Sequence, residues 1–148
     1  MRHLTNEKQA ALFCVFISIL VAATIAPSGS YFFGNFIYFW LPQAGVFLIP
    51  ALIYSRPAVI SGTALVLALY LAAFNSWNVS NGPESLAWLG YLFSLPGAAI
   101  GAGAGALHLK SKTNNKPIYV GAAIAVSTFI GLAINQTFVC STVMYCGS

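Results

Sequence analysis

Residues 90–107 of the chain read GYLFSLPGAAIGAGAGAL. Gly90, Ser94, Gly97, Gly101 and Gly105 recur every three or four residues in this stretch, so a helix places them in one stripe along one side. In water, each Gly in a helix interior costs roughly 1 kcal/mol relative to Ala. In lipid, the backbone polar groups must be satisfied within the segment, which makes a helix the required conformation. Since stripes of small residues let membrane helices bring their backbones into contact, this stretch predicts a membrane-embedded packing helix.

The composition of the whole chain also indicates a membrane protein. Of the 148 residues, 59% are hydrophobic and only 5% are charged, whereas a soluble domain carries about 25% charged residues. We therefore expect one integral membrane domain over residues 1–148, folded as an all-α polytopic bundle, with the lipid bilayer as its surroundings. The net charge of +4 comes from only six Lys and Arg residues. Nucleic-acid binding needs a clustered basic face, so we do not expect a nucleic acid as a partner.

Five apolar stretches have the length of membrane spans, since about 20 residues cross a hydrocarbon core of ~30 Å. The first stretch also has the shape of a signal peptide with cleavage after Ala26, but Pro27 directly after that bond favours a span that is retained. The expected spans are approximately residues 10–26, 36–54, 58–74, 86–107 and 118–139.

The longest polar connection is predicted at residues 75–85, between the third and fourth spans. We expect Asn81 or Gly82 to cap the fourth span. Glu84 is then expected near the start of that helix, where a carboxylate suits the helix dipole.

The distribution of basic residues predicts an orientation. With the amino terminus inside and the carboxyl terminus outside, all six Lys and Arg fall in the inside segments, namely Arg2, Lys8, Arg56, Lys110, Lys112 and Lys116. Inside loops of membrane proteins carry an excess of Lys and Arg. We therefore expect a multi-pass protein of the bacterial inner (plasma) membrane.

The second span is the irregular one, because Pro42, Gln43 and Gly45 stand together near its middle. Pro42 removes a backbone donor and frees a carbonyl about one turn earlier, which Gln43 or a neighbouring helix could satisfy. This feature has two interpretations: a plain structural kink, or a polar kink or pore to which Asn135 of the fifth span would contribute.

A second stripe of small residues predicts which helix contacts the fourth span. Gly121, Ala125, Thr128, Gly131 and Asn135 recur at helical spacing in the fifth span. We therefore expect the fifth span to be the packing partner of the fourth.

Residues that could carry chemistry are sparse. No Asp, Glu, Lys, Arg or His falls within an expected span, and intramembrane charges mark proton relays and ion pathways. We expect no cofactor, no metal site and no carboxylate catalysis. Gly101, Gly103 and Gly105 resemble part of a phosphate loop, but no strand precedes them and no Lys-Ser/Thr follows. The basic segment from His108 to Lys116 either signals orientation or binds anionic lipid headgroups.

Cys140 and Cys146 both lie on the outer side in this topology. An oxidising compartment favours a disulfide between them. The alternative, a membrane thiol oxidoreductase, would resemble families with a CxxC pair and a second reactive pair, which this sequence lacks.

One local resemblance rests on Trp40-Leu41-Pro42, Gly45, Arg56-Pro57 and Gly62. These residues resemble part of a membrane-associated sensory input domain of the kind fused to signalling enzymes. The resemblance covers a small part of the chain, and the number of expected spans is lower than in that family, so no function is assigned from it.

The expected function is non-enzymatic. Small-residue stripes, together with the absence of a catalytic constellation or a proton relay, favour a small inner-membrane protein that binds another membrane protein. An accessory subunit or an immunity-type inhibitor of a membrane-targeting toxin would act in this way. The alternative is a homo-oligomeric transporter or channel for a neutral or weakly charged solute, lined by Gln43, Asn75, Asn135 and Gln136. An enzyme is the third reading.

Overall fold

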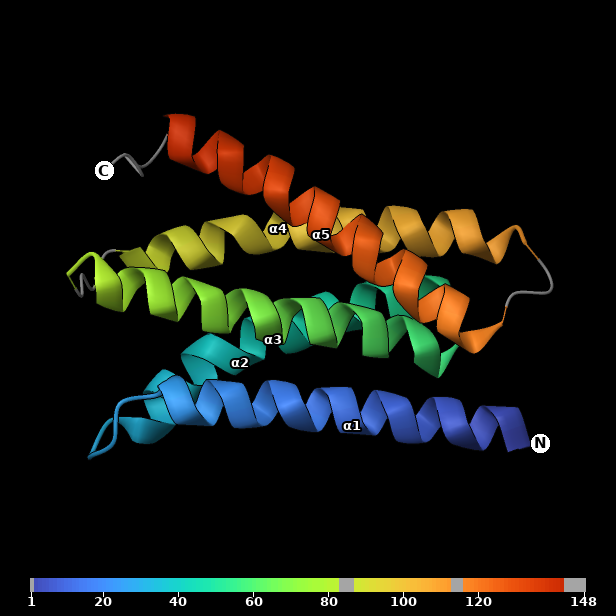
Figure 1. Ribbon diagram of the computed structural model, residues 1–148, viewed down its shortest axis with the longest axis horizontal. Coiled ribbons are helices and arrows are strands. Elements are labelled where there is room, and N and C mark those ends of the chain that lie inside the picture. Colours follow the sequence, from blue (N-terminus) through green and yellow to red (C-terminus); the bar gives the residue numbers. More distant parts are fainter. Residues whose placement is uncertain (1, 83–86, 113–115, 143–148) are drawn as a thin grey trace.

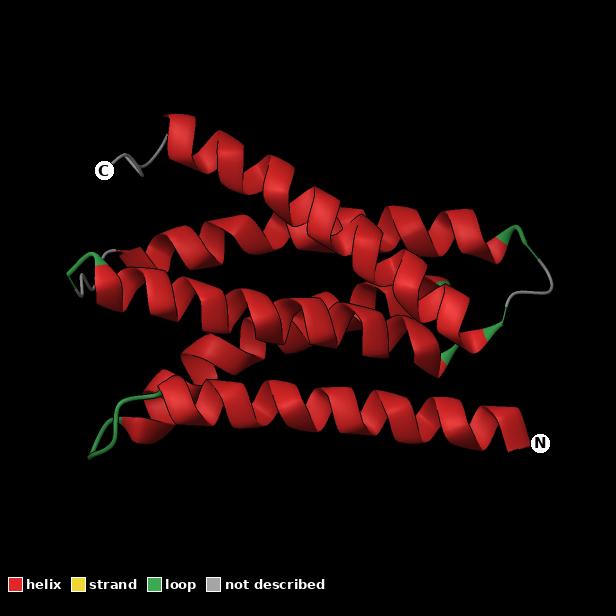
Figure 2. Ribbon diagram, in the orientation of Figure 1, coloured by secondary structure: helices red, strands yellow, loops and turns green. Residues whose placement is uncertain are grey.

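The computed structural model describes residues 2–82, 87–112 and 116–142. Within these ranges the chain forms helices joined by short connections, with no strand (Figure 2). Each helix is long and apolar enough to cross a membrane. The predicted all-helical architecture of five apolar spans is thus confirmed, and it fits a multi-pass membrane protein. The helices are α1 (Arg2–Ile25), α2 (Phe32–Ile53), α3 (Pro57–Ser80), α4 (Ala87–Lys110) and α5 (Pro117–Thr142).

The carboxyl-terminal boundary of α3 corrects the expected polar connection at residues 75–85, because residues 75–80 are helical. The helix starts at Pro57, whose missing N–H is not needed in a first turn, and it continues six residues beyond the predicted end at residue 74. The hydroxyls of Ser76 and Ser80 donate to carbonyls one turn earlier, at 3.0 and 2.8 Å. The hydroxyl groups of these two residues therefore find hydrogen-bond acceptors within the helix, and the residues do not begin a loop.

Asn81, one of the two residues expected to cap the fourth span, instead ends the third helix. The backbone N–H and the side-chain amide of Asn81 both donate to the Trp77 carbonyl, at 3.1 and 2.9 Å. Gly82 follows with a φ of +91°, a conformation that favours Gly at a helix end. Asn81 therefore ends α3 instead of capping α4. Residues 83–86, including Glu84, lie outside the described residues, so a capping role of Gly82 stays a prediction.

Successive helices run antiparallel, so their ends gather at two sides of the bundle (Figure 1). The start of α1, the α2–α3 connection, the end of α4 and the start of α5 lie at one end. Every Lys and Arg of the described side chains lies at this end, which we call the basic end; they are Lys8, Arg56, Lys110, Lys112 and Lys116.

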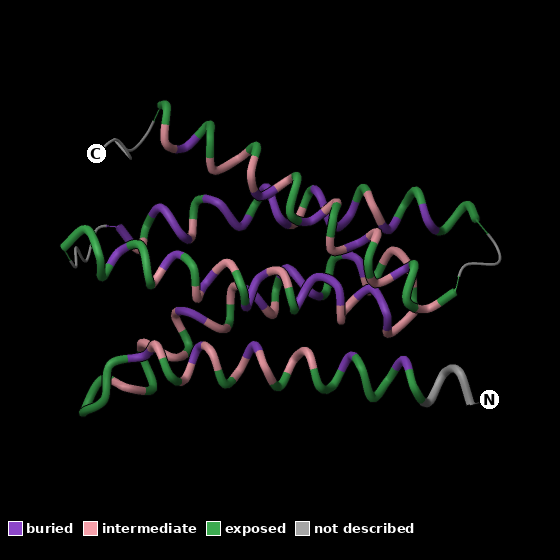
Figure 3. The backbone as a smooth tube through the Cα atoms, viewed as in Figure 1, coloured by how far each residue is buried: buried purple, intermediate pink, exposed green. Residues whose placement is uncertain are grey.

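The helix α3 is central, because it contacts each of the other four helices. The most extensive pairings are α4 with α5 and α1 with α3. Buried positions concentrate on α3 and α4, whereas α1 and α5 leave much of their length exposed (Figure 3). The core therefore lies around α3 and α4, with α1 and α5 at its margins.

The main core cluster is rich in aromatic side chains. Tyr70 and Tyr91 stack with their ring centroids 5.6 Å apart, and the ring centroids of Phe74 and Trp88 lie 5.4 Å apart. Leu67 and Leu71 of α3 are fully buried beside them. A second, smaller cluster at the basic end is built around Val59, Leu109, Val120 and Ile124.

Candidate functional site

The interior of the bundle contains a polar contact among α1, α2 and α4. The Ser18 hydroxyl donates to Gln43 Oε1 at 2.8 Å, and Gln43 Nε2 donates to the Tyr91 hydroxyl at 2.8 Å. All three side chains are buried, and Gln43 is fully so. A buried amide without partners would be costly in lipid, so these bonds hold Gln43 in one position between three helices.

A second polar contact joins α3, α4 and α5. The Tyr70 hydroxyl donates to Gln136 Oε1 at 2.9 Å and lies 2.7 Å from Ser94 Oγ. Ser94 belongs to the predicted glycine stripe, and its hydroxyl also reaches the Tyr91 carbonyl at 2.6 Å. Because Tyr70 stacks on Tyr91, the two polar contacts are neighbours, and together they connect all five helices.

The proline of the second span does not end its helix, since α2 is helical through both Pro42 and Pro50. Pro42 has no N–H for the carbonyl of Tyr38. The neighbouring carbonyl of Phe39 accepts from Gln43 Nε2 and from the Tyr91 hydroxyl, each at 3.3 Å. Side chains thus hydrogen-bond to the backbone around Pro42.

The four residues proposed for a polar kink or pore do not meet at one place. Gln43 is directed to Ser18 and Tyr91, whereas Asn135 Nδ2 donates to the Phe93 carbonyl of α4 at 2.5 Å. Pro42 is half-buried and Gly45 is exposed, with nothing within 4 Å of a Cβ built on Gly45. The contacts of Gln43 and Asn135 therefore belong to helix packing in the described part of the chain.

The glycine stripe of α4 lies against α5. A Cβ built on Gly101 would overlap the Ser127 carbonyl oxygen and come within 3.1 Å of Gly131 Cα. A Cβ on Gly97 would overlap the Gly131 carbonyl oxygen, and one on Gly105 would overlap the Ser127 hydroxyl. Backbone therefore meets backbone at Gly97 and Gly101. Gly90, at the start of the stripe, is buried.

The small-residue stripe of α5 divides between two neighbours. Gly131 and Asn135 face α4, but Gly121 and Ala125 face α3, where a Cβ on Gly62 would overlap the Gly121 carbonyl oxygen and lie 3.1 Å from Ala125 N. The sequence predicted one partner for the whole stripe. Since α5 crosses the other helices obliquely (Figure 1), its two halves meet different helices.

A groove opens between α1, α3 and α5 at the basic end. Its volume is about 400 Å³, within the usual range of ~300–1,000 Å³ for small-molecule pockets. Most of its lining is small or apolar, including Ala10 and Cys14 of α1, Gly62 and Leu65 of α3, and Ala122 of α5. This groove, rather than the predicted kink, is the candidate functional site.

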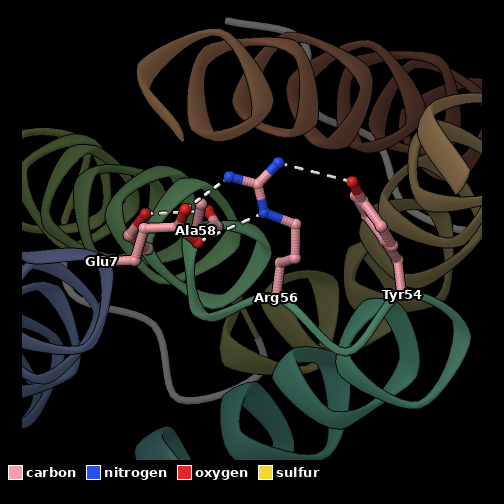
Figure 4. A network of polar contacts seen from close by, with 5 residues as sticks. Glu7, Tyr54, Arg56 and Ala58 are labelled. Atoms are coloured by element: carbon pink, nitrogen blue, oxygen red, sulfur yellow. Dashed lines mark hydrogen bonds and ion pairs between the residues drawn. The ribbon is translucent and has the colours of Figure 1, made fainter. Parts of the chain in front are cut away.

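One end of the groove carries an ion pair between helices far apart in sequence. Arg56 forms two hydrogen bonds with the Glu7 carboxylate, one from Nη2 to Oε1 and one from Nε to Oε2 at 3.3 Å. Arg56 Nη1 also donates to the Tyr54 hydroxyl at 3.4 Å, so the guanidinium lies between the two side chains (Figure 4). The Glu7 side chain is 3% exposed and that of Arg56 is 23% exposed. The hydrogen bonds to Glu7, and then to Tyr54, raise the pKa of Arg56 above its ordinary value.

Glu7 is the main residue that sequence reasoning missed. The expectation that no charged residue or His lies within a span does not hold for two candidate spans of the structure. The span of α1 begins at Asn6 and includes Glu7 and Lys8, and the span of α4 extends to Lys110 and includes His108. The periodicity of α1 contained the signal: Glu7 lies four residues before Ala11 and eleven before Ser18, and all three are buried. At this spacing a helix turns one face toward its neighbour.

Cys14 and Cys140 differ in their bonding. Cys14 is a free cysteine that lines the groove, whereas Cys140 is disulfide-bonded. Cys146 lies outside the described residues, so the pairing of Cys140 with Cys146 stays a prediction. Among the described residues, no group of three or more His, Cys, Asp or Glu side chains is placed to hold a metal ion.

Comparisons with known proteins identify no relative of this chain. No protein-family model, no curated protein and no solved structure matches the chain.

Proposed function

We propose that this chain is a non-enzymatic multi-pass membrane protein of the bacterial inner membrane that acts by binding another membrane protein within the bilayer. An accessory subunit, or an immunity-type inhibitor of a membrane-targeting toxin, would act in this way. The proposed orientation places the basic end in the cytoplasm, because cytoplasmic segments of membrane proteins are enriched in Lys and Arg.

The observation that supports this proposal is that polar side chains in the interior are hydrogen-bonded to neighbouring helices. Of the four side chains expected to line a solute path, Gln43 and Gln136 are bonded to side chains of neighbouring helices, and Asn135 is bonded to the Phe93 carbonyl of α4. Close backbone contacts also join α4 to α5 and α3 to α5. Apart from the groove between α1, α3 and α5, the surfaces left for a partner are the lateral ones, chiefly those of α1 and α5.

The outer half of α5 is the part of this surface that we expect to bind. Its carboxyl-terminal turns diverge from α4 (Figure 1), and Ile134 and Phe138 are 67% and 61% exposed there. Membrane helices associate through van der Waals contact and interhelical hydrogen bonds. A partner helix beside α5 would make van der Waals contact with these two side chains.

The test is recovery of a partner from the native membrane. The tagged protein would be cross-linked in its own membrane, extracted in mild detergent and identified with its partners by mass spectrometry. We expect a second membrane protein in near-stoichiometric amount. Recovery of this chain alone, in a defined oligomer, would instead support a homo-oligomeric transporter or channel.

A matched pair of variants locates the contact. Phe138→Ala should reduce recovery of the partner, because the side chain is exposed on α5. Ile100→Ala is the control, since Ile100 is similarly exposed, at 73%, on α4. Equal loss with both variants would show that the effect is general and that α5 is not the binding surface.

A further inference from the structure

The groove between α1, α3 and α5 has the depth of a single leaflet. Its lining runs from Asn6 to Cys14 on α1 and from Pro117 to Ala125 on α5. At about 1.5 Å per residue, these segments are each about 12 Å long. Half of a hydrocarbon core of ~30 Å is ~15 Å, so the groove starts at the basic end and stops near the bilayer midplane.

This depth favours a lipid chain over a transmembrane helix as the occupant. A helix that crosses both leaflets would need a continuous surface about twice as long. The deep part of the groove is apolar, with Cys14, Leu65 and Ala125 in its lining, whereas Asn6 supplies a polar group at its outer end. An apolar tail inside and a polar headgroup at the basic end match this gradient.

The charges at the outer end favour an anionic headgroup. The Glu7 carboxylate is compensated, because both of its oxygens accept hydrogen bonds from Arg56. Lys116 is exposed directly before Pro117, which lines the groove. Among the described side chains of this end, Glu7 is the only carboxylate, so the local charge is positive.

We propose that this groove is a binding site for one anionic glycerophospholipid, with an acyl chain between α1 and α5 and the phosphate near Lys116. The site goes beyond the proposed partner binding, which concerns the opposite half of α5. Failure of one proposal therefore leaves the other open.

The test is selective lipid retention. The protein would be reconstituted in vesicles of equimolar phosphatidylglycerol and phosphatidylcholine with identical chains, extracted in mild detergent and analysed by native mass spectrometry. We expect one phosphatidylglycerol to be retained in preference to phosphatidylcholine. Since one basic residue near the surface changes anionic-lipid binding about fivefold, Lys116→Gln should lower that preference about fivefold. Equal retention of both lipids by the wild-type protein would overturn the headgroup assignment.

Two variants test the groove itself. Ala122→Phe places a ring in the groove from an exposed position of α5 and should abolish retention, whereas Ile130→Phe, at an exposed position of the same helix outside the groove, should preserve it. Ala10→Phe fills the groove from the α1 wall and serves if Ala122→Phe does not fold. Unchanged retention in a folded groove variant would refute the site.

Extraction from the native membrane distinguishes lipid from protein as the occupant of the groove. By native mass spectrometry, one anionic phospholipid should remain bound to the wild-type protein and be lost from Ala122→Phe. A second protein that is bound to the wild type and lost from Ala122→Phe would mean that a partner helix fills the groove, and would overturn the lipid proposal.

Discussion

Replacing Gly101 by Ala adds a single methyl group at the contact between α4 and α5. The added Cβ would overlap the Ser127 carbonyl oxygen and lie 3.1 Å from Gly131 Cα. Both neighbours are backbone atoms, so relief requires the helices to separate. Overpacking a tight contact costs typically ~1–3 kcal/mol, whereas Gly→Ala in a helix gains roughly 0.5–1 kcal/mol. We therefore expect a net loss of about 1 kcal/mol in the free energy of unfolding.

Gly103→Ala is the matched control, two residues further along the same helix. Its Cβ would lie 3.4 Å from Ile49 Cγ2 and 3.5 Å from Ile53 Cδ1, which are ordinary contacts with flexible side chains. The propensity gain is shared by both variants, so the difference between them isolates the overpacking cost of ~1–3 kcal/mol. The measurement is unfolding by SDS titration in mixed micelles, followed by circular dichroism.

A larger side chain at the same position should amplify the effect. Gly101→Leu should separate the helices, whereas Ile100→Leu changes an exposed neighbour at constant volume and should cost under ~1.5 kcal/mol. If Gly101→Ala and Gly103→Ala are equally stable, and Gly101→Leu is tolerated as well, then α4 and α5 are not in backbone contact and the reasoning is refuted.

Three further predictions concern the polar interior, the orientation and the thiols. In a double-mutant cycle of Gln43→Leu and Tyr91→Phe, the coupling should be about 0.6 kcal/mol and at most ~1.7 kcal/mol, as for other interhelical hydrogen bonds in membranes; additive losses would mean that the 2.8 Å bond contributes nothing. A reporter enzyme that works only after export should be active when it is fused after Ser148, and one that works only in the cytoplasm should be active when it is inserted at Asn114. The reverse result at either point would contradict the proposed orientation. Thiol labelling of the unreduced protein should modify Cys14 alone, and labelling of two further cysteines would show that the tail disulfide is absent.

The candidate site was only partly accessible from the sequence. The glycine stripe and the basic loops were visible because periodicity and charge are properties of short segments. The groove was not visible, because it is formed by three helices whose lining residues are ordinary Ala, Gly, Ser and Leu. Glu7 was left outside the first span, which was expected to begin at residue 10, since nothing near it in the sequence indicates Arg56, which lies 49 residues away.

The sequence by itself determined the number and approximate position of the helices, because the length of an apolar stretch and the need to satisfy its backbone in lipid are local constraints. It also placed every Lys and Arg of the described side chains at one end, since the antiparallel order of five helices fixes which connections share a side. Only the tertiary structure decided that Gly121 contacts α3 while Gly131 contacts α4, and that Gln43 bonds to Ser18 and Tyr91. These contacts depend on how each helix is rotated and at what angle it crosses its neighbours. Rotation and crossing angle result from the packing of all five helices together, so no single segment encodes them.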